Sequence, residues 1–221
     1  MRFSYNLFEL RLLGDAKGLP MQNNLTKKLK RADYLRDPFE VAQQVLLGAY
    51  LCTRMDGVLT AGKITEVEVY IGAHDKGCHA YKGRTERNKA MFGPAGHTYI
   101  YFVYGMHELF NVVVSKAGEA DAILIRALEP VAGIETMQAR RGVQAVKNLA
   151  NGPGKLCQAL GITRTLYGAD LTKSTEIWIS PKTEKTNFIA SKRIGIDYAE
   201  EYKDVPWRFL LKGNGFVSKG A

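Results

Sequence analysis

Polar and apolar residues alternate most clearly in the run ITEVEVYI at residues 64–71. Successive side chains of a β-strand point to opposite faces of the sheet. Glu66, Glu68 and Tyr70 therefore share one face, and the aliphatic residues between them share the other. The pattern predicts a strand that is apolar on one face and carries two carboxylates and a phenol on the other.

Other runs of β-branched, aromatic or aliphatic residues predict the rest of the sheet. They span residues 98–104, 111–114, 122–127, 176–180, 188–196 and 208–212. The polar, glycine-containing segment 116–121 favours an antiparallel connection between two of these runs, and Gly195 makes the run 188–196 irregular. We expect Tyr104 at the rim of its strand, before a turn. We expect Arg126 at the end of its strand, where its charge can meet solvent.

Helix signals flank these runs. Asp37 is a favourable N-cap, Pro38 suits the first helical position and Glu40 completes a capping pattern, so a helix should extend to about residue 50. Two further helices are predicted, one at 132–141 and a short one at LCQAL that ends at Gly161. The elements together predict a single α+β domain with a curved antiparallel sheet flanked by helices.

Length and charge narrow the function classes. The 221 residues are 46% hydrophobic, which is enough for one well-packed domain. The 31 basic and 22 acidic residues give a formal net charge of +9, which suits a protein that binds nucleic acid but also a basic enzyme kept dispersed by its charge. We expect residues 1–32, including the basic run 27–31, to form an N-terminal extension before a domain at 33–221. That basic run is either a solvated arm or a phosphate contact.

Cysteine usage and hydropathy indicate the compartment. Three cysteines without C-x-x-C spacing favour a reducing environment and argue against structural zinc. Neither a signal peptide nor an apolar run of about 18 residues is visible. We therefore expect a soluble intracellular protein without a membrane partner, in the cytoplasm or nucleoid of a prokaryote or the nucleus of a eukaryote. No coiled-coil pattern calls for a dimer, so a monomer is expected.

Candidate chemistry concentrates around the alternating strand. A carboxylate beside aromatic rings loses solvation, gains basicity and can take a proton from water, which makes Glu68 a candidate general base. Glu66 lies on the same face, and the pattern does not separate the two. Five tyrosines between residues 70 and 104 suit either a sheet core or base stacking. The histidines and Cys78 match no metal-binding motif, and no nucleotide-binding motif is present, so we expect neither metal nor cofactor.

Several motifs, taken in order, resemble the 3-methyladenine (alkyladenine) DNA glycosylase family. They are TEVEVY, HAYKGRTERN, MFGPAGHTYIYFVYGMH, NVV, LIRALEP and NGPGKLCQALGI, within a match from about Asp33 to Ser218. The resemblance implies a monofunctional base-excision repair enzyme that flips an alkylated or deaminated purine out of double-stranded DNA and hydrolyses its N-glycosidic bond. It also implies a single-domain fold distinct from the helix-hairpin-helix glycosylases.

The resemblance assigns roles to individual residues. Glu68 matches the general base that activates the attacking water, and Arg126 and the backbone near Ile194 match groups that help to hold this water. Tyr70, His79 and Tyr101 match the side chains that bracket the flipped base. Asn111 matches the residue that crowds the exocyclic amine of normal guanine, and Tyr104 matches the side chain that inserts into the gap in the DNA stack.

Two residues depart from the family pattern. Val69 stands where alanine is frequent, and Ala95 interrupts the usual turn before Gly96-His97. We expect both departures to narrow the pocket and so to alter the range of substrates rather than the type of reaction.

Overall fold

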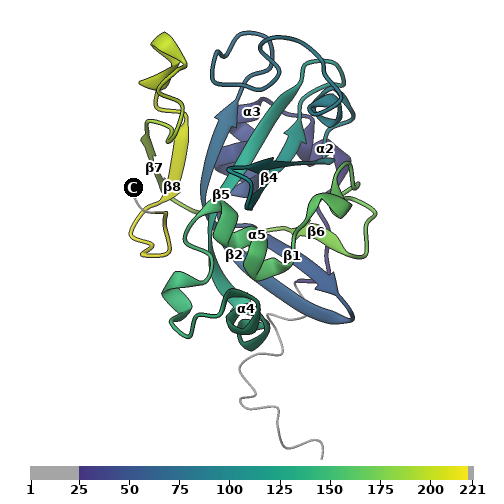
Figure 1. Cartoon of the computed structure of the whole chain (residues 1–221), viewed down its shortest axis with the longest axis vertical. Helices are drawn as coiled ribbons and strands as arrows, with labels where there is room; N and C mark the ends of the chain where they lie inside the picture. Colours follow the sequence, from purple (N-terminus) through teal and green to yellow (C-terminus); the bar gives the residue numbers. More distant parts are fainter. Residues whose placement is uncertain (1–24, 219–221) are drawn as a thin grey trace, which may run out of the picture.

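The computed structural model describes residues 25–218, and residues 1–24 of the predicted N-terminal extension lie outside this range. Within it, the chain forms an eight-stranded antiparallel sheet. The strands are β1 (Tyr50–Met55), β2 (Val58–Tyr70), β3 (Thr98–Val103), β4 (His107–Val114), β5 (Asp121–Ala132), β6 (Ile177–Ser180), β7 (Phe188–Ser191) and β8 (Arg208–Leu211). The predicted α+β fold with a curved antiparallel sheet is confirmed (Figure 1).

Strand β2 organises the sheet because it has partners along both edges. One edge pairs with β5 over most of its length, while the other pairs first with β1 and then, at residues 66–68, with β8. The register against β5 shifts at several points between Ala61 and Val67. Such bulges bend a strand and increase its twist. The bent second half of β2 carries both glutamates that the sequence singled out.

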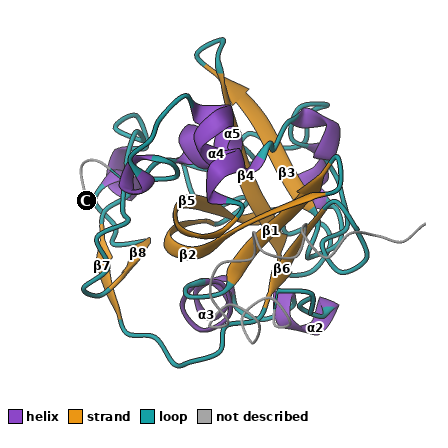
Figure 2. Ribbon diagram, turned by 90° about the horizontal axis from the view of Figure 1, so that it is seen from below, coloured by secondary structure: helices purple, strands orange, loops and turns teal. Residues whose placement is uncertain are grey.

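Helices lie on both sides of this sheet. The longer ones are α4 (Ile134–Arg141) and α5 (Pro153–Leu160), and the shorter ones near the N-terminus are α2 (Arg31–Tyr34) and α3 (Pro38–Glu40). Figure 2 shows α4 and α5 on one side of the sheet and α2 and α3 on the other. Single turns of 3-10 helix occur at Lys89–Phe92, Val146–Asn148, Arg164–Leu166 and Glu200–Lys203. None of the helices within residues 25–218 has the length and apolar character needed to cross a bilayer.

The helix predicted from Asp37 begins as expected but ends earlier. The Asp37 carboxylate accepts hydrogen bonds from the Phe39 and Glu40 amides, at 2.9 and 3.1 Å. After α3 the chain continues as a π-helix at Val41–Leu46. Gly48 then adopts a φ of +88°, which favours glycine and turns the chain into β1. Strand β1 therefore occupies residues where the sequence predicted the last part of a helix or no element.

Arg126 is not at a strand end, contrary to expectation. Strand β5 continues to Ala132 because Ala127, Leu128 and Glu129 keep their pairing with β2. Arg126 is therefore mid-strand and 6% exposed. Its charge meets buried carboxylates on β2 rather than solvent.

The basic run at 27–31 is not a solvated arm. Leu29 is buried, and its amide donates to the Ile179 carbonyl on β6 at 2.9 Å. Arg31 forms an ion pair with Asp170 at 2.5 Å. Leu29 and Arg31 therefore attach this run to the domain, while Lys27 and Lys30 remain exposed.

Candidate active site

A cavity of about 570 Å³ opens over one face of β3, β4, β5 and the end of β2. The segment 194–198, which follows β7, closes one of its sides. Aromatic side chains supply much of the wall, namely Tyr70, Tyr99, Tyr101, Phe102, Tyr104 and Tyr198. Strand alternation explains the separation from the core: Ala122, Leu124 and Arg126 of β5 face the cavity, while the isoleucines between them belong to the main apolar core.

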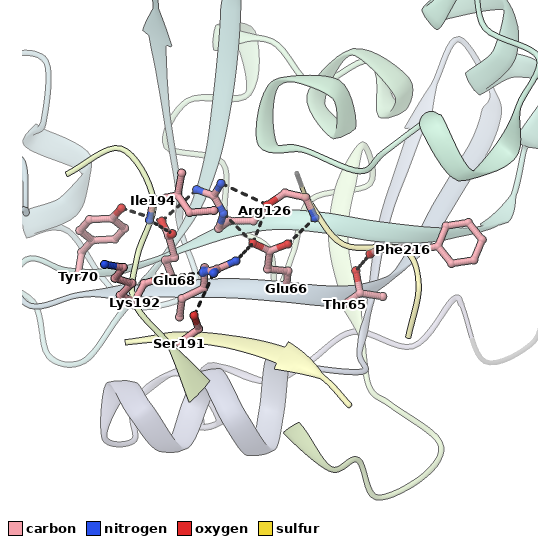
Figure 3. A network of polar contacts seen from close by, with 11 residues as sticks. Thr65, Glu66, Glu68, Tyr70, Arg126, Ser191, Lys192, Ile194 and Phe216 are labelled. Atoms are coloured by element: carbon pink, nitrogen blue, oxygen red, sulfur yellow. Dashed lines mark hydrogen bonds and ion pairs between the residues drawn. The ribbon is translucent and has the colours of Figure 1, made fainter. Parts of the chain in front are cut away.

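Glu68 is fully buried and lies directly behind this wall, since its hydrogen-bond partners line the cavity and Glu68 itself does not. One carboxylate oxygen accepts from the Ile194 backbone N–H at 2.7 Å. The other accepts from the Tyr70 hydroxyl at 2.8 Å and from the Arg126 guanidinium at 3.2 Å (Figure 3). Burial raises the pKa of the Glu68 carboxyl above its ordinary value, although Arg126, the Ile194 amide and the Tyr70 hydroxyl each act to lower it. All three partners line the cavity.

Glu66 is equally buried but has different neighbours. Its carboxylate accepts from Arg126 at 2.9 Å, from Arg208 at 3.2 Å, and from the amide and hydroxyl of Ser218 at 2.7 and 2.8 Å. Two guanidinium groups and a serine near the end of the described residues therefore enclose it. Neither glutamate itself lines the cavity, but all three partners of Glu68 do, whereas Arg126 is the one partner of Glu66 that does. The structure thus separates the two carboxylates that the alternating pattern left equivalent.

His79 and Tyr101 both line the cavity and pack edge to face, with ring centroids 4.5 Å apart and an interplanar angle of 73°. The His79 Nδ1 atom is 2.8 Å from the Tyr99 hydroxyl. Burial, together with the nearby charge of Arg87, lowers the pKa of His79 to about 4. The imidazole is therefore neutral at physiological pH. The sequence did not single out Tyr99 and Arg87 as site residues, although Tyr99 shares the strand face of Tyr101.

Tyr104 and Asn111 occupy opposite ends of the same hairpin. Tyr104 follows β3, has a φ of +52° and is 87% exposed, and Gly105 follows it with a φ of +67°. Consecutive residues in this conformation form the tight turn that suits the twist of two antiparallel strands. The predicted position of Tyr104 at the rim is confirmed. Asn111 is buried in β4, lines the cavity and donates to the Tyr99 carbonyl at 3.1 Å.

The two departures from the family pattern do not line the cavity, so the expectation that they narrow it is wrong. Val69 and Ala95 are both buried in the main apolar core. Val69 lies between Glu68 and Tyr70 on β2, and strand alternation directs it to the opposite face. Of the histidines and Cys78, only His79 and Cys78 line the cavity. Residues 25–218 contain no group of three or more His, Cys, Asp or Glu side chains arranged to hold a metal ion.

The chain matches the family described as methylpurine-DNA glycosylase over residues 32–215. Similar proteins from Clostridium acetobutylicum and Carboxydothermus hydrogenoformans are 48% identical over 201 residues and 47% identical over 194 residues. Each alignment covers 86% of this chain and 97% or 98% of the relative. Both relatives have names that carry the words 3-methyladenine DNA glycosylase. The resemblance seen in the sequence is confirmed: the chain belongs to the methylpurine-DNA glycosylase family and is a DNA N-glycosylase of base-excision repair.

Proposed function

We propose that this enzyme flips an alkylated or deaminated purine into the aromatic cavity and hydrolyses its N-glycosidic bond with water activated by Glu68. The substrates would be 3-methyladenine, 7-methylguanine, hypoxanthine and ethenoadenine, and the product an abasic site. The observation that carries the proposal is the placement of Glu68. It is a buried carboxylate with a raised pKa, and its three hydrogen-bond partners all line the cavity.

The hydrogen bonds of Glu68 support the proposal that it binds the attacking water. An ionised carboxylate has about four lone-pair sites, and Tyr70, Arg126 and the Ile194 amide use three of them. In the proposed step, Glu68 takes a proton from water while the water oxygen bonds to the sugar C1′ carbon. The bond from C1′ to the purine nitrogen breaks, and its electron pair leaves with the base. Arg126 and the Ile194 amide hold Glu68 and the water in place.

The cavity wall supports a monofunctional, single-carboxylate mechanism. Retaining glycosidases need a second carboxylate as nucleophile at about 5 Å, but Glu66 is enclosed by Arg126, Arg208 and Ser218 outside the cavity. A bifunctional glycosylase needs an amine to attack the sugar. Among residues 25–218, no lysine lines the cavity.

The aromatic wall suits a damaged purine. The rings of Tyr70 and Tyr101, with the neutral His79 imidazole, offer faces on which a flipped base can stack. A purine alkylated at N3 or N7 is cationic, so aromatic faces attract it more strongly than a neutral base. A cationic base also leaves without prior protonation. Asn111 is buried and lines the cavity, which supports the proposal that it crowds the exocyclic amine of a normal guanine.

The rim of the cavity suits double-stranded DNA. Flipping leaves a gap in the base stack, and a side chain that fills the gap offsets part of the unstacking cost. Tyr104 projects from the hairpin turn with 87% of its surface exposed. The net charge of +9 favours binding to the phosphate backbone, and affinity should therefore fall with salt. We propose that the enzyme acts as a monomer, without an obligate protein partner.

The test is single-turnover excision from a duplex oligonucleotide carrying one alkylated or deaminated purine, scored as alkali-cleaved abasic product. Wild type, Glu68→Gln and the exposed control Glu176→Gln are compared. Product from wild type and the control, but not from Glu68→Gln, is expected. Equal product from Glu68→Gln would contradict the role of Glu68, and no product from wild type across several lesions would contradict the proposed substrates. Strand cleavage without alkali would contradict the monofunctional mechanism.

A further inference from the structure

A buried arginine that the sequence did not single out stands directly behind the cavity wall. The side chains of Arg193 and Asp75 are both fully buried, and both terminal nitrogens of the guanidinium contact the carboxylate. Arg193 also donates to the Val69 carbonyl at 2.9 Å and to the Tyr202 carbonyl at 3.3 Å. A planar guanidinium that grips a carboxylate with two parallel bonds fixes orientation as well as distance.

Arg193 immediately precedes the residue whose backbone amide contacts Glu68. The Ile194 N–H donates to the Glu68 carboxylate at 2.7 Å, yet residues 192–197 form neither helix nor strand. Strand hydrogen bonds therefore do not fix this amide. Contacts of its neighbours hold the segment: the Arg193 side chain grips Asp75, and the Lys192 carbonyl accepts from Arg208 at 2.7 Å. The Lys192 side chain also pairs with Asp204 at 3.6 Å, and the Ile196 carbonyl accepts from the Ala199 amide at 2.8 Å.

The same guanidinium packs on the ring of Tyr70. Its central carbon lies 4.6 Å from the centroid of the Tyr70 ring and 5.0 Å from that of Trp207. These are distances at which a cation attracts an aromatic face. Tyr70 lines the cavity with its ring and reaches Glu68 with its hydroxyl. Arg193 thus contacts a ring proposed to hold the base and lies next to an amide proposed to hold the carboxylate.

Asp75 connects this arrangement to the opposite loop of the cavity. Its carboxylate accepts from the Gly77 amide at 2.8 Å, in the turn that leads to His79. A Cβ atom at Gly77 would lie 3.1 Å from the Asp75 carboxylate and 3.2 Å from the Arg193 guanidinium. Glycine therefore allows the turn to approach the ion pair closely. The pair ties together two loops that both contribute to the cavity wall.

We propose that Arg193, paired with Asp75, is a positioning residue that holds the Ile194 amide on Glu68 and the Tyr70 ring in the cavity wall. The inference rests on the proposed role of Glu68. It adds that the activity of Glu68 depends on an ion pair that contacts neither the water nor the damaged base.

The first measurement is the hydrogen exchange of the Ile194 amide by NMR, which needs no activity. Slow exchange in the wild type and clearly faster exchange in Arg193→Lys are expected, because lysine is a flexible point charge that cannot grip a carboxylate with two parallel bonds. The control is Arg31→Lys, which alters the ion pair with Asp170 and whose described partners do not line the cavity. Fast exchange of Ile194 in the wild type would overturn the proposal.

The second measurement is single-turnover excision as a function of pH. Arg193→Lys should lower the rate by about tenfold or more, the order expected for losing a hydrogen bond to a charged group. The groups that face Glu68 are Arg126, Glu66, Tyr70, Tyr101 and Arg193. Arg193→Lys leaves all of these charges in place. Loss of the hydrogen bond from the Ile194 amide therefore raises the pKa of Glu68 further, and the acidic limb of the pH–rate profile should move to higher pH. Arg31→Lys should leave this limb in place.

A double variant separates the effect of the ion pair on the position of the Ile194 amide from its effect on the stability of the fold. Arg193→Met with Asp75→Asn removes both charges and so avoids leaving one buried charge unpaired. The proposal expects slow excision and a shifted acidic limb to persist in this variant even where it is as stable as the wild type. Excision at the wild-type rate with an unshifted limb would show that the pair only stabilises the fold. If the wild type itself does not excise, the proposed function fails, while the Ile194 exchange experiment still decides the positioning.

Discussion

Glu66 and Glu68 are two residues apart on one strand face, are equally buried and share Arg126, yet their surroundings differ. Glu66 accepts four hydrogen bonds from Arg126, Arg208 and Ser218. Of these three partners, the shared Arg126 is the one that lines the cavity. Glu68 accepts three, each from a group in the cavity wall. The same residue type on the same strand is thus enclosed at one position and next to a binding site at the other.

The difference teaches that burial alone does not mark a catalytic carboxylate. A buried charge is tolerated when charged and polar partners satisfy it, and partners that lie away from a cavity keep the group out of reach of a substrate. A buried carboxylate whose partners all line a cavity lies next to the place where substrate and water would bind. We therefore expect substitutions at the two positions to affect different properties of the enzyme.

The largest expected effect is on catalysis at Glu68. Glu68→Gln keeps the shape of the side chain but removes the group that accepts the proton, so single-turnover excision should fall by about a hundredfold to ten-thousandfold. Circular dichroism and lesion binding should stay close to wild type. A rate within a few fold of wild type would remove the distinction between the two carboxylates.

Glu66→Gln should affect stability instead. Neutralising Glu66 leaves Arg126 and Arg208 with too little negative charge in a buried site, which should lower the free energy of unfolding by about 3 to 5 kcal/mol. Urea denaturation measures this cost. Excision per folded molecule should be far nearer to wild type than in Glu68→Gln. The contrast fails if Glu66→Gln abolishes excision without loss of stability.

The sequence predicted the alternating strand and the meander because a two-residue period follows directly from strand geometry. It missed β1, although Asp56 and Gly57 were a readable hairpin signal. Both adopt positive φ values between the paired residues Met55 and Val58, as Asp-Gly turns commonly do. The helix predicted from Asp37 was too long because the prediction passed over Gly48, whose φ of +88° turns the chain away after the π-helix.

The site was less readable from the sequence than the strands. Arg126 looked like a strand end because its neutralising carboxylates lie 58 and 60 residues earlier in the chain. The Arg193–Asp75 pair spans 118 residues, and no spacing rule connects these positions. Family resemblance supplied Glu68 as the preferred base, whereas the alternation pattern alone left Glu66 open. Long-range charge pairing was the information that the local pattern lacked.

The next largest effect is expected on excision in Tyr104→Ala. This variant tests the exposed rim of the cavity, in contrast to the buried carboxylates. Stacking on an aromatic side chain is worth about 1 to 3 kcal/mol, so excision from duplex DNA should weaken by about five- to a hundredfold. Thermal stability should change little because the side chain is 87% exposed. Excision from a single-stranded substrate, which has less stacking to replace, serves as the comparison. Equal losses on both substrates would argue against insertion.

Val69→Ala tests the opposite face of the strand that carries the carboxylates. The residue is fully buried in the apolar core, so truncation should cost about 1 to 3 kcal/mol of stability. Because Val69 does not line the cavity, the ratio of excision rates for two different lesions should not change. A change in this ratio would restore the idea that this departure from the family pattern alters substrate range.

The smallest expected effect is a pH dependence in stability that belongs to Glu68. Burial raises the pKa of this carboxyl above its ordinary value of 4.5 in the folded protein, so the native state binds the proton more tightly than the unfolded chain. Linkage then requires that the contribution of Glu68 to stability is fully present below pH 4.5 and is lost as the pH rises through the folded-state pKa.

Glutamine at this position resembles the protonated acid and does not titrate. The free energy of unfolding of Glu68→Gln relative to wild type should therefore increase from pH 4 to pH 8, measured by urea denaturation at each pH. Groups that titrate in both proteins cancel in this difference. A difference that falls with pH would mean that Arg126, Tyr70 and the Ile194 amide outweigh burial, so that Glu68 is held as a stable anion and is a poor base.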